Sequence, residues 1–204
     1  MASRLRTLWT RALQNPITFP TTPEEVIPLT SMLDWNQLSQ LAITPVVMDP
    51  CAGNMAINRT LHQELPLLAE RAYLMSNDVD VTHPTEFHFD CVNPDEWTVV
   101  PYEVDVFVCS PPFDIIDCIW PYLVMQAEVF TALHVPGDYI SNGPPWRRAY
   151  WSYLQQEGLA VELRGLPRVK GRGTRRCSWI IVFATTEYKQ LFWQAQTDCF
   201  TLFT

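Results

Sequence analysis

The chain has 204 residues and a formal net charge of −8, with 14 lysines and arginines against 22 aspartates and glutamates. Its composition, 48% hydrophobic and 18% charged, is sufficient for a buried core and excludes a disordered chain. No apolar run reaches the roughly 18–20 residues of a membrane span. The net negative charge excludes non-specific binding of polyanions by the protein surface as a whole.

The length predicts one main domain over residues 21–188, with a helical extension over 1–20 and a tail or short helix over 189–204. Six cysteines without any CxxC pair indicate reduced thiols, and therefore an intracellular protein of the nucleus or cytoplasm. Targeting to an organelle by the basic N-terminal stretch stays open. The four histidines show no metal-ligand spacing, so we expect no metal site.

The first half of the chain alternates helical patterns with short apolar segments. Residues 2–14 form a predicted basic amphipathic helix that ends before Pro16, and Thr22 is placed to cap a helix that begins near Pro23. Further helices are predicted over 32–41 and from Gly53 towards residue 67. Short strands are predicted over 45–48, 72–76, 87–89 and 104–109.

In the second half, a long helix is predicted over 115–133, with Pro121 as a kink or first turn, followed by a strand over 137–140. A helix over 145–157 and strands over 160–166 and 179–184 complete the pattern. Strands that alternate with helices predict an α/β fold, a mostly parallel sheet with helices on both faces. Only a loop separates the last two strands, which predicts an antiparallel hairpin at one edge.

The ends of the predicted strands carry polar residues. Asp49, Asp78 and Asp90 follow the first three strands, and Ser110-Pro111-Pro112-Phe113 (SPPF) follows the fourth. Proline lacks an N–H and belongs at strand ends and in loops. Because open α/β sheets bind ligands beyond the carboxyl ends of their strands, these residues predict a functional site at that edge.

Two of these strand ends resemble motifs of the S-adenosylmethionine-dependent amino-methyltransferases, which modify the exocyclic amine of adenine or cytosine in nucleic acid. Asp49–Gly53 is similar to the cofactor motif DPxxGxG of that family. Ser110–Phe113 is similar to its catalytic motif, which is Asp, Asn or Ser, then Pro-Pro and an aromatic residue. The resemblance covers most of residues 20–185 and implies a Rossmann-like class I methyltransferase fold. His134–Tyr139 and Arg147-Arg148 also resemble the adenine-methylase-like domains of some eukaryotic retroelements.

The resemblance implies S-adenosylmethionine as the cofactor and assigns roles to residues of this chain. Gly53 would let the backbone approach the methionine part, Asp78 would accept from the ribose hydroxyls, and Asp90 would accept from the adenine amine. The implied cofactor-binding residues are Thr22, Pro23, Asp49, Cys51, Ala52, Gly53, Asn77, Asp78 and Asp90. The implied catalytic residues are Ser110, Pro111, Pro112 and Phe113.

The residue types of the SPPF motif suit the activation of an amine. An exocyclic amine is a weak nucleophile because its lone pair is delocalised into the ring. In the family, the side chain of the first residue and the backbone carbonyl after it accept the amine hydrogens and favour a more tetrahedral nitrogen. The two prolines restrict that backbone, and Phe113 would stack on a base flipped out of its helix.

The segment 164–176 concentrates positive charge in an otherwise acidic chain. Its guanidinium groups suit phosphate contact, although a solvated loop is the alternative interpretation. The predicted nucleic-acid-binding residues are Arg168, Lys170, Arg172, Arg175 and Arg176. DNA is the expected partner, while RNA, a protein partner and a homodimer stay open, and no membrane partner is expected.

Two positions depart from the family pattern. Met55 stands where the family has its second glycine, and it adds a side chain beside the expected cofactor pocket. Ser110 stands where many adenine-specific enzymes have Asp or Asn, so adenine N6 is the first hypothesis for the target and cytosine N4 stays open. The alternative function is a catalytically weak or inactive methyltransferase-like subunit that binds nucleic acid or a catalytic partner.

Overall fold

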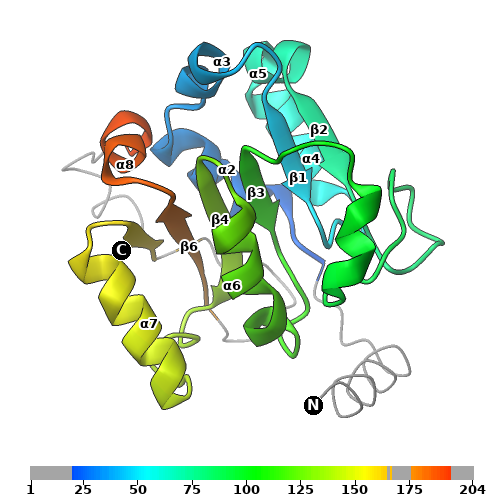
Figure 1. Cartoon of the computed structure of the whole chain (residues 1–204). Helices are drawn as coiled ribbons and strands as arrows, with labels where there is room; N and C mark the ends of the chain where they lie inside the picture. The colour runs from blue at the N-terminus through cyan, green and yellow to red at the C-terminus, as the bar shows by residue number, and fades with distance from the viewer. Residues whose placement is uncertain (1–19, 165, 167–175, 194–204) are drawn as a thin grey trace.

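A computed structural model describes residues 20–164, 166 and 176–193 of the chain. The helix predicted over 2–14 and most of the basic segment lie outside the described residues. Within them, six strands form one sheet in the order β2-β1-β3-β4-β6-β5 (Figure 1). No helix of the described residues is both long enough and apolar enough to cross a membrane.

The sheet is parallel except for one strand. Strands β1, β2, β3 and β4 pair in parallel, and β6 runs antiparallel to both β4 and β5. The predicted α/β fold with an antiparallel hairpin at one edge is therefore confirmed, with β6 inserted between β4 and β5. The strands are β1 Val46–Asp49, β2 Tyr73–Ser76, β3 Val106–Cys109, β4 Phe130–Pro136, β5 Ala160–Leu163 and β6 Cys177–Phe183.

Helices cover both faces of the sheet (Figure 1). On one face, core side chains come from α2 Pro23–Met32, α3 Leu38–Leu41, α4 Ala56–Glu64, α5 Pro66–Arg71, α8 Thr186–Phe192 and the short 3-10 helix η1 Trp35–Gln37. On the other face, core side chains come from α6 Ile116–Gln126, α7 Pro145–Gln156 and the 3-10 helix η2 Pro94–Val99.

Strand β3 shows why the centre of the sheet forms where it does. All four of its residues, VFVC, are buried, which is typical of a central parallel strand covered on both faces. Val106 and Val108 join the core on the α2 side, whereas Phe107 and Cys109 join the core on the α6 side. This alternation assigns Ser110, the next residue, to the α2 side.

Several predicted element bounds are wrong. The helix predicted over 115–133 ends at Gln126, and the following strand is Phe130–Pro136, while 137–140 are turn residues. Pairing with β3 and β6 on either side makes this apolar stretch a strand, and no local pattern encodes that pairing. The strand predicted over 87–89 is a single bridge between Asn77 and Phe87.

The prediction of one helix over 32–41 is also wrong. Helix α2 ends at Met32, Leu33 and Asp34 are not helical, and the short helices η1 and α3 follow. The Asp34 side chain accepts a hydrogen bond from the backbone N–H of Asn36 (3.2 Å). This local side-chain bond caps a new helical start and competes with continuation of the preceding helix.

Candidate functional site

The carboxyl edge of the parallel sheet gathers the residues that the sequence singled out. Asp49 is the last residue of β1, and Ser110 follows the last residue of β3. Cys109 pairs with Leu133 across the β3–β4 register, which places Ser110 beside His134. The start of β6 lies at the same edge, because Cys177 pairs with Pro136.

The loop after β1 is held by the side chains of two aspartates. Asp49 accepts a hydrogen bond at Oδ1 from the N–H of Cys51 (3.1 Å), and Asp78 accepts at Oδ2 from the N–H of Gly53 (2.8 Å). Gly53 has a φ of +47°, and an added Cβ there would contact only Asp78 Oδ2, at 4.0 Å. The loop therefore has open space beside Gly53, as a backbone that approaches a ligand requires.

The carboxyl group of Asp49 lies inside the protein. Burial raises its pKa to about 8, and the nearby charge of Asp78 raises it further, against a hydrogen bond from Cys51 that lowers it. Asp49 is thus mostly protonated at neutral pH, with an O–H available to donate. Burial, and then the charge of Glu96, likewise raise the pKa of Asp90.

Asn77 is fully buried and holds loops together. Its amide Nδ2 donates to the carbonyls of Pro50 and Phe89, both at 3.0 Å, and its Oδ1 accepts from the N–H of Phe89 (2.9 Å). Its backbone carbonyl accepts from the N–H of Ala52 (2.9 Å). These bonds use the Asn77 side chain within the protein, so its place in the site is structural support of the loop after β1.

Asp78 and Asp90 both accept hydrogen bonds from their own loops. Asp78 Oδ1 accepts from the N–H of Asp80 (2.9 Å), and Asp90 Oδ1 accepts from the N–H of Val92 (3.0 Å). Each carboxylate oxygen offers two lone pairs, so acceptor capacity remains on both side chains.

Cys51 joins the loop after β1 to the loop that carries Asp90. Its Sγ lies 3.6 Å from Sγ of Cys91, and both are free thiols. A hydrogen bond with Cys109 and burial raise the pKa of Cys51 well above its usual value. The neighbouring Ala52 is buried.

Met55 takes a left-handed backbone conformation, which favours glycine. Its φ of 63° and ψ of 24° are left-handed, and it directly precedes α4. Among the described residues it is the one non-glycine position with positive φ. The loop therefore holds Met55 in a conformation that disfavours a side chain.

The SPPF motif directly follows β3, and its four residues differ in exposure. Ser110 and Phe113 are half-buried, Pro111 is buried and Pro112 is exposed. Phe113 packs against the cores of both sheet faces. Part of the Phe113 ring surface therefore remains accessible at the edge where the motif lies.

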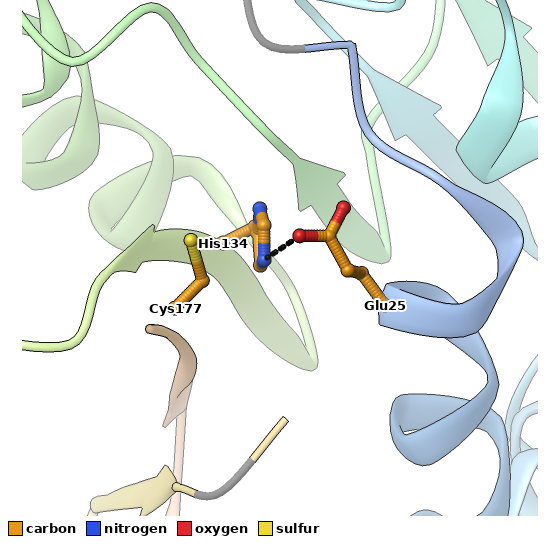
Figure 2. Close-up of side chains that lie close together, drawn as sticks. All are labelled: Glu25, His134 and Cys177. Atoms are coloured by element: carbon orange, nitrogen blue, oxygen red, sulfur yellow. Dashed lines mark ion pairs between the residues drawn. The ribbon is translucent and has the colours of Figure 1, made fainter. Parts of the chain in front are cut away.

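Ser110 belongs to a buried polar network that the sequence did not predict. Its Oγ lies 3.1 Å from Nδ1 of His134, and Nε2 of His134 lies 3.8 Å from Oε1 of Glu25. Figure 2 shows His134 between Glu25, from α2, and Cys177, from β6. His134 and Glu25 are almost completely buried.

The predicted cofactor-wall residues Thr22 and Pro23 lie at the start of α2. Glu25 Oε2 accepts from the N–H of Thr22 (3.0 Å), which is half of a capping box. The Thr-x-x-Glu spacing could have predicted Glu25 as the partner in this cap, but nothing in it identifies His134 as the next partner.

Glu25, His134 and Cys177 are the group of metal-ligand side chains that lie close together among the described residues. Their ligand atoms lie within 4.8 Å of one another, and all three side chains are buried. Structural zinc takes four ligands, and this group offers three.

Arg147, from the pattern that resembles retroelement domains, is committed to the fold. Its guanidinium pairs with Asp117, donates to the carbonyl of Tyr139 (2.6 Å) and lies 3.8 Å from the centre of the Tyr139 ring. Burial, and then a hydrogen bond to Asp117, raise the pKa of Tyr139. These contacts join the loop after β4 to α6 and α7.

The basic segment is described only at its ends. Arg168, Lys170, Arg172 and Arg175 lie outside the described residues. Arg176 is exposed, and its carbonyl accepts from the N–H of Gly137 (2.8 Å). The segment leaves β5 after Leu163 and enters β6 at Cys177, so both of its ends lie at the carboxyl edge of β4.

No family model matches the sequence, and no curated protein matches it. Solved structures share its fold at low identity. A Listeria monocytogenes protein assigned to the class I S-adenosylmethionine-dependent methyltransferases is 12% identical, with a TM-score of 0.54 over 89% of this chain and 66% of that one.

Two further structures belong to type I restriction systems. The methyltransferase subunit from Streptococcus thermophilus is 11% identical, with a TM-score of 0.54 over 81% of this chain and 44% of that one. The M protein of the EcoKI enzyme is 13% identical, with a TM-score of 0.52 over 82% of this chain and 44% of that one. The chain thus spans less than half the length of these two proteins and shares the fold of class I methyltransferases.

Proposed function

We propose that the protein is an S-adenosylmethionine-dependent methyltransferase that acts on the exocyclic amine of a base in DNA. Adenine N6 is the first candidate target and cytosine N4 the second. The observation that carries the proposal is the position of SPPF, which follows β3 directly at the carboxyl edge of a class I methyltransferase fold. The methyltransferases of type I restriction systems among the similar structures support a nucleic-acid substrate.

The residues after β1 and β2 fit the proposed cofactor. S-adenosylmethionine, when bound, supplies an electrophilic methyl group on its sulfonium. Space beside Gly53 admits a ligand close to the backbone, and Asp78 and Asp90 offer carboxylate oxygens with remaining acceptor capacity. Asp49, protonated at neutral pH, stabilises the loop through the N–H of Cys51.

The residues after β3 would hold the target amine. Ser110 Oγ and the carbonyl of Pro111 would accept its two hydrogens, which directs the nitrogen lone pair away from the ring. Phe113 would stack on the flipped base, since base–aromatic stacking contributes about 1–3 kcal/mol. The exposed Arg176 would contact a phosphate at the same edge.

The test is single-turnover transfer of labelled methyl to oligonucleotides that contain adenine or cytosine. Ser110→Ala should lower the rate about ten- to a hundredfold, which corresponds to about 1–3 kcal/mol of transition-state stabilisation. Its S-adenosylmethionine affinity, measured by calorimetry, should stay close to that of wild type. Ser141→Ala, at an exposed serine in the loop after β4, is the matched control and should transfer at the wild-type rate. Phe113→Ala should lose both rate and DNA affinity.

Equal rates for Ser110→Ala and wild type would contradict the assigned role of SPPF. If wild type binds S-adenosylmethionine but transfers methyl to no oligonucleotide, the inactive-subunit hypothesis becomes the better one. No binding of the cofactor would contradict the proposed function at its first step.

DNA binding is tested through its salt dependence. Replacing Arg172, Arg175 and Arg176 by Gln should weaken binding and reduce the slope of log affinity against log salt, by about one for each lost phosphate contact. Arg71→Gln is the control for a lost charge, because Arg71 is exposed at the end of α5, at the opposite edge of the sheet. An unchanged slope in the triple variant would restore the solvated-loop interpretation.

A further inference from the structure

A serine in the first position of the motif poses a chemical problem. The Asp or Asn that many adenine-specific enzymes carry there has an oxygen that only accepts. A serine hydroxyl accepts and also donates. If the hydroxyl hydrogen points at the target amine, it faces the amine hydrogens and hinders the oxygen lone pairs from accepting them. Something must therefore take the hydroxyl hydrogen of Ser110.

His134 is placed to take it. Nδ1 of His134 lies 3.1 Å from Ser110 Oγ, which is hydrogen-bond distance. In a neutral imidazole one nitrogen carries the proton and the other accepts, so the direction of this bond depends on the tautomer. With the proton on Nε2, Nδ1 accepts the hydroxyl hydrogen and the Ser110 lone pairs face outwards.

Glu25 favours that tautomer. Its Oε1 lies 3.8 Å from Nε2, so a proton on Nε2 faces a carboxylate oxygen, whereas an Nε2 lone pair would be repelled by it. Oε2 accepts from the N–H of Thr22 (3.0 Å), and the backbone carbonyl of Glu25 accepts from Nε1 of Trp179 (2.7 Å). These two bonds hold Glu25 in place opposite His134.

The His134 ring is also restrained. Its centre lies 5.1 Å from that of the Trp179 ring, and the planes of the two rings meet at 44°. Only 1% of the His134 side-chain surface is exposed. Glu25 lies in α2, Ser110 directly follows β3 and His134 lies in β4, so the arrangement depends on the tertiary fold. Figure 2 shows the Glu25 carboxylate directed at the ring.

We propose that Glu25 and His134 are positioning residues that make Ser110 a hydrogen-bond acceptor towards the target amine. The carboxylate of Glu25 sets the proton on Nε2 of His134, and Nδ1 takes the hydroxyl hydrogen of Ser110. Ser110 then serves as the acceptor that Asp or Asn would otherwise supply. This proposal rests on the proposed function, because Ser110 must face an amine for the orientation to matter.

Two substitutions disturb this orientation in different ways. His134→Gln removes the ring. Glu25→Gln should reverse the hydrogen-bond directions. The amide oxygen of Gln must accept from the N–H of Thr22, so its NH₂ group points at Nε2 of His134 and donates to it. The reversed tautomer would donate from Nδ1 to Ser110.

The decisive experiment is a comparison of these variants in two backgrounds, by single-turnover methyl transfer. With Ser110 present, each variant should lower the rate about tenfold, which corresponds to loss of one hydrogen bond. With the Ser110→Asn substitution, whose side-chain oxygen accepts without help, each should change the rate by less than about twofold. A merely structural role would lower the rate equally in both backgrounds.

A second measurement reads the tautomer without any catalysis. The chain has four histidines, so nitrogen NMR of protein labelled at histidine gives few signals, and the His134→Gln variant assigns the relevant pair. Wild type at mildly alkaline pH should show a protonated Nε2 and an unprotonated Nδ1, and Glu25→Gln should show the reverse. This readout keeps the proposal testable if His134→Gln fails to fold.

The outcomes separate the two proposals. If wild type transfers no methyl, the proposed function fails and this role of Ser110 fails with it. If wild type is active but the variants lose the same rate in both backgrounds, the positioning role alone is overturned. A protonated Nδ1 in wild type would also overturn it. Binding of one equivalent of zinc that is lost in Cys177→Ala would overturn the proposal as well, because Glu25 and His134 would then be metal ligands.

Discussion

The two halves of the carboxyl edge are built in different ways. In the half proposed to bind the cofactor (the cofactor half: the loops after β1 and β2), polar side chains bind backbone groups of the same two or three loops, as Asp49, Asn77 and Asp78 do. In the half proposed to hold the target amine (the catalytic half: the ends of β3 and β4), side chains from segments far apart in the sequence contact one another, through Ser110, His134 and Glu25.

This difference has a consequence for what each half tolerates. Side chains that bind backbone determine the shape of a loop, so their loss should appear mainly as lost stability. Side chains that orient one another determine the direction of hydrogen bonds, so their exchange should appear mainly in the rate of the reaction. Three changes in the cofactor half test the first part of this comparison.

The largest effect is expected for Asn77→Ala. The substitution leaves the carbonyls of Pro50 and Phe89 and the N–H of Phe89 without their side-chain partner inside the protein. We expect a loss of about 3 kcal/mol in the free energy of unfolding, measured by urea denaturation. Asn142→Ala, at an exposed turn, is the control and should change stability by less than about 0.5 kcal/mol.

The comparison also predicts that Asn77→Ala leaves the catalytic half unchanged. In the native fraction of this variant, the nitrogen signals of His134 should match those of wild type. Altered His134 signals would show that the two halves are coupled, which would contradict the distinction between them.

A pH-dependent effect, smaller than that of Asn77→Ala over any single pH unit, is expected for Asp49→Asn. Because burial raises the pKa of Asp49 from 3.8 to about 8, the folded state retains a proton that the unfolded state loses between these values. Wild-type stability should therefore fall with rising pH across this window, by at most about 1.4 kcal/mol per pH unit for one proton. Asparagine keeps an acceptor for the N–H of Cys51 without the charge.

The measurement is the free energy of unfolding of wild type and Asp49→Asn at several pH values between 4 and 8. The variant should gain stability relative to wild type as the pH rises. The same comparison for Asp95→Asn, at an exposed position in η2, controls for a general change of charge. A constant difference between Asp49→Asn and wild type would argue against a protonated Asp49.

The smallest effect, and one of opposite sign, is expected for Met55→Gly. The left-handed backbone of Met55 disfavours a side chain, so glycine should stabilise the protein by up to about 1 kcal/mol. Met125→Gly, at an exposed helical position in α6, should instead destabilise it by about 0.5–1 kcal/mol. Thermal unfolding of both variants gives the sign, and a less stable Met55→Gly protein would contradict the strain argument.

The sequence by itself determined the class of fold and the edge at which the candidate site lies. Alternating apolar segments and helical patterns predict a parallel sheet, because their periods reflect local backbone geometry. Asp49, Gly53 and Ser110 were identified as strand-end residues, since proline and glycine mark such ends through local steric effects. The spacing of the motif identified Met55 as a departure from the family pattern, whereas its left-handed backbone came from the structure.

The tertiary structure decided what those residues contact. The β3–β4 register places Ser110 beside His134, and the packing of α2 on the sheet brings Glu25 to the same ring, although Glu25 and His134 lie far apart in the sequence. Burial, which depends on every element around it, raises the pKa of Asp49 to about 8. Local patterns carry no information about such pairings, because strand register and helix docking are set by contacts between distant segments.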